Sequence, residues 1–443
     1  MGDHRTEAAC LLETGTAFPS RIGLRLNDHE LVFAGLKPEG LSIYYGDEPI
    51  FHFDPEGRWR HAFVSGVHYY KGLDSTTTAV DRTREGVNLV LKRRILSYVE
   101  TTEFDDRVRK TAIDLLEAIE SKRVDSASPP VGVETLDLGE LAKVLNKAVR
   151  WDSAAWFAQR ERYREQFGEL PFLPPGSERS IVLEATIGHP NGVGFGGSIV
   201  SEHRVRSVSE FQTHVERVAQ IWGERAFHAK SIYLAGGGVL TRPFGDVIEY
   251  LEAIAATFPF AERPDDQTSV ERNRGVVRCF IDDFSGEIPN QDQLALYCEK
   301  GLDRVDIGMI SGDRSIRSVF GRNWADSSFD SFFKSVKAAG IPLGILFLLG
   351  AGGKERSADH VRSIFETIER IEPSEGDFVF LLDLEEVGGE SAIARLREAG
   401  LVHTGRGDRI DEQKQIKTAL LDQTKRRGFK IVPYGMEKQM NRY

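Results

Sequence analysis

A glycine-rich loop at residues 188–198 has the setting of a metal-binding loop but lacks the metal ligands. An apolar segment typical of a strand, residues 181–187, precedes the loop, and an amphipathic helical pattern follows it. Positions i, i+4 and i+7 of the loop are His189, Val193 and Gly196. A histidine can bind a metal, whereas valine and glycine side chains offer no ligand atom. We expect His189 to act as a base or substrate contact rather than as a metal ligand, because metal sites usually need three or four protein donors.

Two adjacent carboxylates follow a second apolar segment, residues 276–281. Asp282 and Asp283 could reach the open end of a barrel, where one of them would bind a cation or accept a proton. Helix capping or solvent exposure is the alternative at the end of a strand. Acidic residues at 383–386 follow a later strand pattern. They would either give the open end of the barrel a negative charge or form a solvated loop.

Repeated strand and helix patterns place these residues in a parallel α/β fold. The helical patterns include an apolar stripe at residues 208–222, which follows a capping-box spacing at Ser207. Strands that are apolar throughout and alternate with helices predict a parallel sheet, closed or partly closed into a barrel. Functional residues are then expected on the loops after the strands. The predicted strands are residues 181–187, 231–235, 276–281, 304–310, 343–349 and 378–382.

The rest of the chain predicts an extension on each side of this barrel. A proline-rich segment at residues 170–176 marks the entry to the barrel. Before it, residues 49–53 and 59–64 flank a tight turn and predict a hairpin, and residues 104–168 have helical patterns. After residue 390 come two helical stretches and a last strand-like piece at residues 429–434. We therefore predict an N-terminal α+β domain (1–168), a partial (βα)6 barrel (177–387) and a C-terminal α/β extension that packs on the barrel (388–443).

Four potential metal ligands fall within a short window of the predicted N-terminal domain: His52, Asp54, His61 and His68. Their spacings match no metal motif, and alternation along a hairpin would point half of them to each face. We expect these residues to have a structural role.

Composition excludes some classes of protein and partner. The chain has 443 residues, 40% of them hydrophobic, which is ample for a sizeable core. Its formal net charge of -11 does not favour binding to the negatively charged backbone of nucleic acid. The longest apolar run, residues 341–353, is too short for a membrane span, and the N-terminus lacks a signal-peptide pattern, so we expect a cytoplasmic protein. The three cysteines, Cys10, Cys279 and Cys298, are too scattered for a disulfide framework or a local thiolate metal site.

Residues 180–385 resemble the six-unit partial barrel of the radical S-adenosylmethionine (SAM) superfamily through these motifs. In that family the positions of His189, Val193 and Gly196 carry Cys-x-x-x-Cys-x-x-Cys, whose thiolates hold three irons of a [4Fe-4S] cluster. The three glycines that end the second strand resemble its Gly-Gly-Glu motif, which receives the SAM amino group. Residues 304–313 resemble its ribose-contacting fourth-strand motif, and residues 340–355 its glycine-rich fifth-strand exit. The contacts to SAM that the resemblance implies are Gly236, Gly237, Gly238, Ser311, Asp313, Gly350 and Gly352.

The departures from the family pattern concern the same motifs. No cluster cysteine is present in the loop, Gly238 stands where an acid is common, and Ile310 stands where a glutamate is common. Asp313 could equally cap the next turn. The glycines that permit close backbone approach are retained. The resemblance therefore implies a SAM pocket without the cluster.

Three hypotheses follow. In the first, the protein is an iron-sulfur-free enzyme that uses SAM as a substrate or cosubstrate in polar chemistry, a transferase or lyase. Methyl or aminocarboxypropyl transfer to a small molecule and intramolecular SAM cleavage or cyclisation are all compatible with it. His189, Asp282 and Asp283 are its candidate catalytic residues. In the second, the chain is a catalytically inactive homologue that serves as a scaffold or binds a protein partner. In the third, Cys279 and Cys298 or a partner's thiolates hold a cluster, although two thiols cannot supply the usual three or four ligands.

Overall fold

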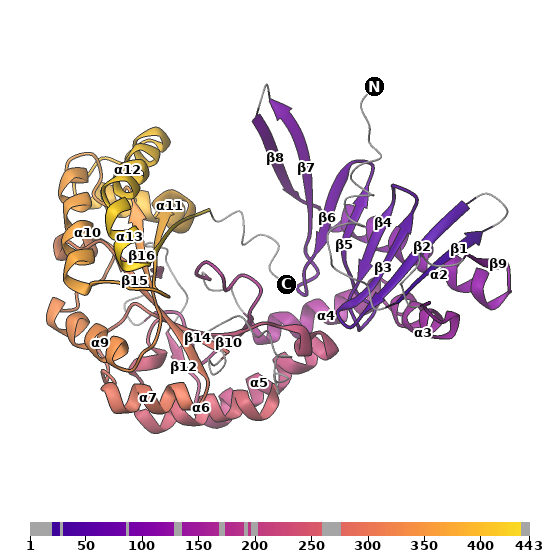
Figure 1. Cartoon of the computed structure of the whole chain (residues 1–443), viewed down its shortest axis with the longest axis horizontal. Helices are drawn as coiled ribbons and strands as arrows, with labels where there is room; N and C mark the ends of the chain where they lie inside the picture. The colour runs from indigo at the N-terminus through magenta and orange to yellow at the C-terminus, as the bar shows by residue number, and fades with distance from the viewer. Residues whose placement is uncertain are drawn as a thin grey trace. The chain divides into compact units, whose positions relative to one another are not determined.

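The computed structural model divides into two compact units, which are described separately (Figure 1). It describes residues 20–26, 30–85, 88–127, 135–167, 173–189, 194–195, 203–258 and 276–435. Among these residues, unit 1 comprises those up to 167 together with 220–228, and unit 2 comprises 173–219 and 229–435. None of the described helices combines the length and the apolar character that crossing a membrane requires.

Unit 1 is built on a nine-stranded antiparallel sheet with the order β8-β7-β6-β5-β4-β3-β2-β1-β9. Strands β1 to β7 each pair with the next strand along the chain, and β9 returns to pair with β1. Helices α2 (Tyr98–Glu120), α3 (Leu138–Val149) and α4 (Ser153–Gln166) complete the unit. The strands are β1 (Ser20–Leu26), β2 (Glu30–Lys37), β3 (Gly40–Tyr45), β4 (Ile50–Phe53), β5 (Trp59–Val64), β6 (Val67–Lys71), β7 (Thr77–Glu85), β8 (Asn88–Ile95) and β9 (Val124–Ala127).

The predicted hairpin at residues 49–64 is confirmed as β4 and β5, which pair antiparallel. Asp54 closes its turn, because Oδ1 accepts hydrogen bonds from the backbone N–H groups of Glu56 and Arg58. Alternate residues of β4, Phe51 and Phe53, are buried in the core of unit 1 together with residues of α2 and α3. The hairpin is therefore held both by its turn and by one apolar face.

Unit 2 contains a seven-stranded parallel sheet with the order β10-β13-β14-β15-β16-β17-β18. All six predicted strands are present in it, and the strand-like piece at residues 429–434 adds the seventh, β18, which pairs with β17. The sheet does not close, because β10 and β18 are its edges, so the fold is α/β with a partial barrel. The strands are β10 (Ile181–Glu184), β13 (Ile232–Ala235), β14 (Val277–Ile281), β15 (Leu302–Ile310), β16 (Leu343–Leu349), β17 (Phe378–Asp383) and β18 (Lys430–Tyr434).

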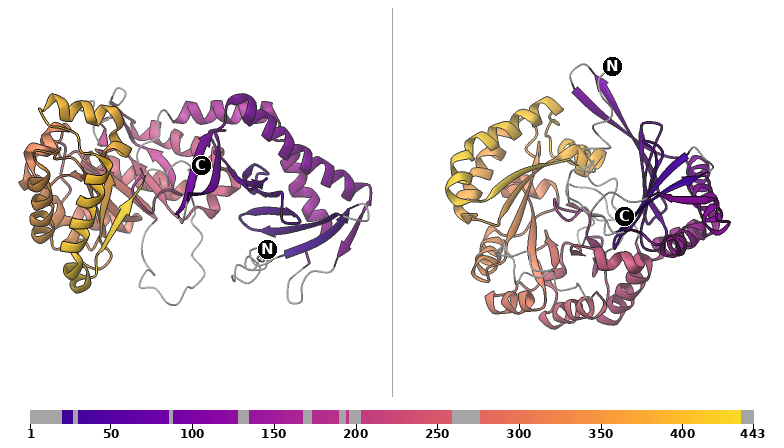
Figure 2. Two further views of the ribbon diagram at one scale, coloured as in Figure 1. Left: turned by 90° about the horizontal axis from the view of Figure 1, so that it is seen from above. Right: turned by 45° about the vertical axis from the view of Figure 1, so that its right-hand side comes forward.

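Helices connect successive strands of this sheet and lie along its outer side (Figures 1 and 2). The predicted capping box at Ser207 is confirmed by reciprocal hydrogen bonds between Ser207 and Glu210 at the start of α5. A short antiparallel pair, β11 (Thr186–Ile187) and β12 (Arg204–Val205), lies between β10 and α5. The helices are α5 (Val208–Trp222), α6 (Phe244–Thr257), α7 (Gln291–Glu299), α8 (Arg314–Val319), α9 (Asp326–Ala338), α10 (Ser357–Ile371), α11 (Leu384–Glu398), α12 (Arg406–Ala419) and α13 (Leu421–Arg427), with 3-10 turns η2 (Gly223–His228) and η3 (Val239–Thr241).

The two faces of the parallel sheet differ in chemistry. Leu234 and Cys279 are register partners on one face, which is apolar and lies toward α7, where the Cys279 thiol influences Tyr297. Tyr233 and Arg278 are register partners on the opposite face. This inner face carries the buried or half-buried polar residues of the strands: Glu184, Tyr233, Arg278, Arg304 and Asp306.

A buried ion pair in unit 1 generates a stability prediction. Lys71 Nζ lies 2.8 Å from Asp105 Oδ2, and the other oxygen of Asp105 accepts a hydrogen bond of 2.7 Å from Trp59 Nε1. Asp105→Asn leaves the buried ammonium without a countercharge, and we expect the free energy of unfolding to fall by about 3 kcal/mol. Asp114→Ala breaks the exposed Lys110–Asp114 pair and should cost less than about 0.5 kcal/mol. Urea unfolding followed by tryptophan fluorescence measures both, and equal losses would contradict the prediction.

Candidate functional site

The chain segments that follow the parallel strands β10, β13 and β14 bring His189, Gly237 and Asp282 together. Nε2 of His189, which follows β11, lies 3.5 Å from Oδ1 of Asp282, which follows β14. The carbonyl oxygen of Gly237 accepts the backbone N–H of Asp282 at 3.1 Å and thereby fixes where this carboxylate leaves the sheet. Both side chains are buried. The structure thus joins two predicted site residues that lie 93 positions apart in the sequence.

Arg322 completes this cluster and was not found by sequence reasoning. Its Nη2 forms a buried ion pair with Oδ2 of Asp282, and its Nη1 donates a hydrogen bond of 3.0 Å to the Phe320 carbonyl oxygen. Burial opposes ionisation of Asp282, but the charge of Arg322 and the contact with His189 outweigh it, so the pKa of Asp282 lies below its ordinary value. The site therefore holds an ionised carboxylate beside an imidazole. No local signal marks Arg322, because its loop reaches Asp282 only in the folded chain.

The glycines at the end of β13 make room for side chains of this cluster. A Cβ atom on Gly237 would lie 1.9 Å from Asp282 Oδ1, and one on Gly236 would lie 1.8 Å from Thr186 Oγ1. Gly236 also has a φ of +115°, which disfavours other residues. A Cβ atom on Gly238 would meet nothing closer than 3.6 Å. Packing within the chain thus requires glycine at positions 236 and 237, whereas position 238 has room for a Cβ atom.

Two aromatic rings, those of Phe195 and Phe280, pack beside Asp282. The rings of Phe195 and Phe280 meet edge to face with centroids 5.4 Å apart. A Cβ atom on Gly308 would lie within 3.0 Å of both rings and of Asp282 Cβ, so only glycine fits at this point of β15. Val193 and Gly196, the other two spacing positions of the loop, lie outside the described residues.

Asp283, the second predicted carboxylate, serves a local turn. It is buried, and its Oδ1 accepts a hydrogen bond of 3.1 Å from the backbone N–H of Ser285. Its own N–H donates to the carbonyl oxygen of Gly237 at 3.3 Å. The next helix, α7, begins only at Gln291, so Asp283 forms a local turn and not a helix cap, whereas Asp282 contacts His189 and Arg322.

Four predicted SAM contacts lie in a different network, between β15, β16 and the helices that follow them. Ser311 Oγ lies 2.8 Å from Nδ1 of the buried His360, and the N–H of Gly350 donates to Glu412 at 3.3 Å. Asp313 accepts hydrogen bonds from the first turn of α8 as its N-cap and pairs with Arg356 at 2.8 Å. A Cβ atom on Gly352 would lie 2.6 Å from the Arg356 carbonyl oxygen. No described contact links these four residues to Asp282.

The acidic run after β17 is offset by one arginine. Arg409 Nε lies 2.7 Å from Asp383 Oδ2, and its Nη2 lies 2.6 Å from Glu385 Oε2. Asp383 is also the N-cap of α11. This end of the sheet is therefore less acidic than the sequence run indicates.

The histidines of unit 1 do not alternate between the two faces as predicted. His52 is the register partner of His61, and His68 is the partner of Phe63, so all three histidines lie on one face. Their rings stack with centroids 5.1 and 5.3 Å apart. Burial lowers the pKa of His52 to about 4 and that of His61 to about 3, which keeps both neutral. Asp54 lies apart from them because a bulge and the turn follow His52, and it pairs with Arg58.

The thiols of unit 2 do not gather. Cys279 is buried on the apolar face, and burial raises the pKa of its thiol well above the ordinary value. Burial raises the pKa of Cys298, on α7, to about 11. Among the described residues, no group of three or more histidine, cysteine or acidic side chains has the geometry of a metal site.

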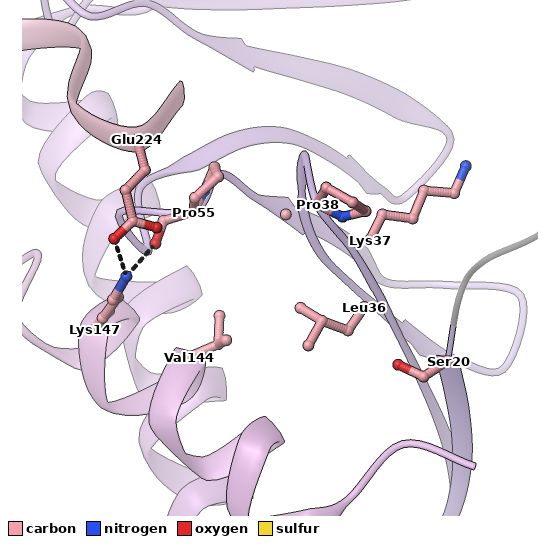
Figure 3. Close-up of a pocket in the computed structure, with 9 residues that line it drawn as sticks. Ser20, Leu36, Lys37, Pro38, Pro55, Val144, Lys147 and Glu224 are labelled. Carbon is pink, nitrogen blue, oxygen red and sulfur yellow. Dashed lines mark hydrogen bonds and ion pairs between the residues drawn. The ribbon is translucent and has the colours of Figure 1, made fainter. Parts of the chain in front are cut away.

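A separate cavity of about 320 Å³ lies in unit 1 (Figure 3). Lys147 Nζ, at its edge, contacts the Pro55 carbonyl oxygen at 2.9 Å and Glu224 Oε1 at 3.0 Å. The remaining lining is formed by small, apolar and proline residues together with Lys37. It shares no residue with the cluster around Asp282.

Comparison with known proteins gives only distant likenesses. No family model matches the sequence, and no curated protein does. The radical SAM methyltransferase TsrM from Kitasatospora setae is 12% identical over 52% of this chain and 38% of its own, with a TM-score of 0.31. Coproporphyrinogen III oxidase (HemN) from Escherichia coli, a radical SAM enzyme, is 13% identical over 60% and 56%, with a TM-score of 0.40. HydG, a maturase of the [FeFe]-hydrogenase, is 12% identical over 73% and 65%, with a TM-score of 0.35. The chain thus spans less than two thirds of each of these proteins.

The glycines at the end of β13 give a matched pair of variants. Gly237→Ala places a methyl group against Asp282, and we expect it to lower the free energy of unfolding by about 1–3 kcal/mol. Gly238→Ala meets only ordinary contacts and has a φ of -115°, so its stability should change by less than about 0.5 kcal/mol. Thermal unfolding of both variants decides the matter. Equal melting temperatures would show that Gly237 is not constrained by Asp282.

Glu412 generates a pH-dependent prediction. Burial raises its pKa to about 7, against about 4.3 in the unfolded chain, so the folded state keeps a proton that the unfolded state loses between these values. The stability that Glu412 contributes is therefore complete below about pH 4.3 and is lost as the pH rises through 7. Relative to Glu412→Gln, the wild type should lose about 2 kcal/mol between pH 5 and pH 8 in urea unfolding. A difference that does not change with pH would contradict this.

Proposed function

We propose that unit 2 binds SAM at the carboxyl ends of β10, β13 and β14 and uses its sulfonium in polar chemistry. The observation that carries this proposal is the ionised Asp282, which is buried between His189 and Arg322 at a glycine-lined strand end. A buried carboxylate attracts a cation strongly, because little water screens it. The sequence motifs around the same strand ends support the choice of SAM as that cation.

The donor set of the loop does not fit an iron-sulfur cluster. A cluster of the radical type needs three thiolates, whereas the loop offers only His189 at those positions. Cys279 faces the helices, and its raised pKa disfavours the thiolate that a metal requires. The proposed chemistry therefore uses no cluster.

Each residue of the cluster has a defined part in this proposal. SAM supplies an electrophilic carbon next to a positively charged sulfur. Asp282 binds the positive charge, and Arg322 holds Asp282 in place. His189 orients or deprotonates the reacting group, because its imidazole is positioned by the carboxylate. Phe195 and Phe280 exclude water from one side. Methyl or aminocarboxypropyl transfer and intramolecular SAM cleavage or cyclisation all use these elements.

The second candidate function, a catalytically inactive scaffold for a protein partner, is favoured by a different observation. The side chains of Ser311 and Asp313 make their described contacts within the chain, and position 238 has no acid. The SAM contacts of Ser311, Asp313, Gly350 and Gly352 accordingly stay predictions. A stoichiometric partner in native extract and failure to bind SAM would favour the scaffold.

Calorimetry with SAM and with S-adenosylhomocysteine, its uncharged thioether counterpart, tests the proposal. We expect the wild type to bind SAM more tightly than the thioether, because only SAM has the charge that Asp282 attracts. Asp282→Asn should weaken SAM binding at least tenfold, about 1.4 kcal/mol, and leave the thioether nearly unchanged. Asp105→Asn, which removes a buried paired carboxylate from unit 1, is the matched control and should bind SAM as the wild type does. No binding of SAM at millimolar concentration would refute the proposal.

A further inference from the structure

Glu184 is a buried carboxyl on the inner face of the parallel sheet. It is the last residue of β10 and is 4% exposed. Glu184 is the register partner of Ala235, two positions after Tyr233, and Tyr233 is the partner of Arg278. Since side chains two positions apart share a face, the carboxyl lies on the same inner face as these residues. It is thus placed near the strand ends that form the candidate site.

The main chain of Glu184 is hydrogen-bonded on both sides, whereas one oxygen of its carboxyl group has no hydrogen bond within the described part of the chain. Its N–H donates a hydrogen bond of 3.1 Å to Nε2 of His214, and its carbonyl oxygen accepts one of 2.8 Å from Arg206 Nε. Burial lowers the pKa of His214 to about 3, so the ring is neutral and can accept this bond. Oε2 of Glu184 has no hydrogen-bond partner among the described residues.

A second orphaned acceptor lies two positions further along the chain. Thr186 is 3% exposed, and its Oγ1 also lacks a partner among the described residues. A Cβ atom on Gly236 would lie 1.8 Å from this oxygen, so the hydroxyl fills the space at the end of β13. Buried polar groups without partners are costly, and native proteins retain them where a ligand or water binds.

The pKa values of the two buried carboxyls at these strand ends are shifted in opposite directions. Asp282 has Arg322 as a countercharge and a lowered pKa. Burial raises the pKa of Glu184 to about 7, and the charge of Arg206 offsets this only in part. Two carboxyls whose environments separate their pKa values in this way divide the work of charge binding and proton transfer.

We propose that Glu184 and Thr186 form a subsite for a small-molecule substrate that carries a primary amine, and that Glu184 accepts a proton from its ammonium group. In this step an N–H bond breaks, the proton binds a carboxylate oxygen of Glu184, and the electron pair stays on nitrogen, which becomes a free amine nucleophile. An ammonium suits this carboxyl better than a hydroxyl does, because the acid strength of a hydroxyl is far too low for such a base. The inference rests on the proposed function, to which it adds the second substrate.

Calorimetry with n-butylamine, and with n-butanol as the uncharged isostere, tests the subsite in the full chain. We expect the wild type to bind the amine more tightly than the alcohol at neutral pH. Glu184→Gln should weaken amine binding at least tenfold. Glu412→Gln is the matched control, because Glu412 is also buried with a pKa of about 7 but bonds to Gly350, and it should bind the amine as the wild type does.

Infrared difference spectroscopy gives a second readout that needs no turnover. The wild type should show a protonated-carboxyl band that increases when n-butylamine binds, because the Glu184 carboxylate takes up the ammonium proton, and this increase should be absent in Glu184→Gln. If circular dichroism shows that Glu184→Gln does not fold, Thr186→Val is measured instead. This variant should bind the amine more weakly and still show the protonated-carboxyl band of Glu184. Equal amine binding by the wild type and the folded variant, or no preference for amine over alcohol, overturns the inference.

Calorimetry with SAM distinguishes failure of this inference from failure of the proposed function. Amine binding that depends on Glu184, in a protein that does not bind SAM, would refute only the proposed function. SAM binding without amine binding that depends on Glu184 would refute only this inference.

Discussion

The parallel register of the seven strands in unit 2 is the constraint on which the rest of that unit depends. Because all strands run the same way, their carboxyl ends meet at one edge, and every loop that follows a strand begins there. The same register puts Leu234 and Cys279 on a wholly apolar face that the helices cover, and puts Tyr233 and Arg278 on the inner face. A shift of one residue would exchange these faces and bury the charges against the helices. The position of the candidate site therefore follows from the register before any individual side chain is considered.

Within this frame, the two carboxyls near the strand ends differ because of their neighbours. Asp282 is more deeply buried than Glu184, yet it is ionised, since Arg322 reaches it from the loop after α8. The charge of Arg206 offsets the effect of burial on Glu184 only in part, so burial dominates its pKa. The same carboxyl chemistry thus yields an ionised group in one place and, in the other, a group with a pKa near neutral pH.

The glycine motifs that resemble those of the radical SAM superfamily have separate physical causes in this chain. Gly237 is required because the Asp282 carboxylate occupies the space of a Cβ atom, and Gly308 because two aromatic rings do. Gly350 has a φ of +83° and faces Thr404 and Arg409, far along the chain. Similar glycine patterns therefore arise from packing of the chain on itself as well as from the approach of a ligand, and each one has to be judged from its surroundings.

Local patterns in the sequence were sufficient for the strands of unit 2 and for the hairpin of β4 and β5, because apolar runs and turn residues act over a few positions. They also singled out His189 and Asp282, which the structure brings within 3.5 Å of each other. They did not distinguish Asp282 from Asp283, since only the fold brings Arg322 and His189 to one of the two. They missed most of the nine-stranded sheet of unit 1 and misplaced its histidines, because the bulge after His52 and the cross-strand pairs depend on partners outside any local window. Glu184 did carry a signal, as a lone charge in an apolar strand, but only the tertiary structure decided the burial that dominates its pKa and leaves Oε2 without a hydrogen-bond partner among the described residues.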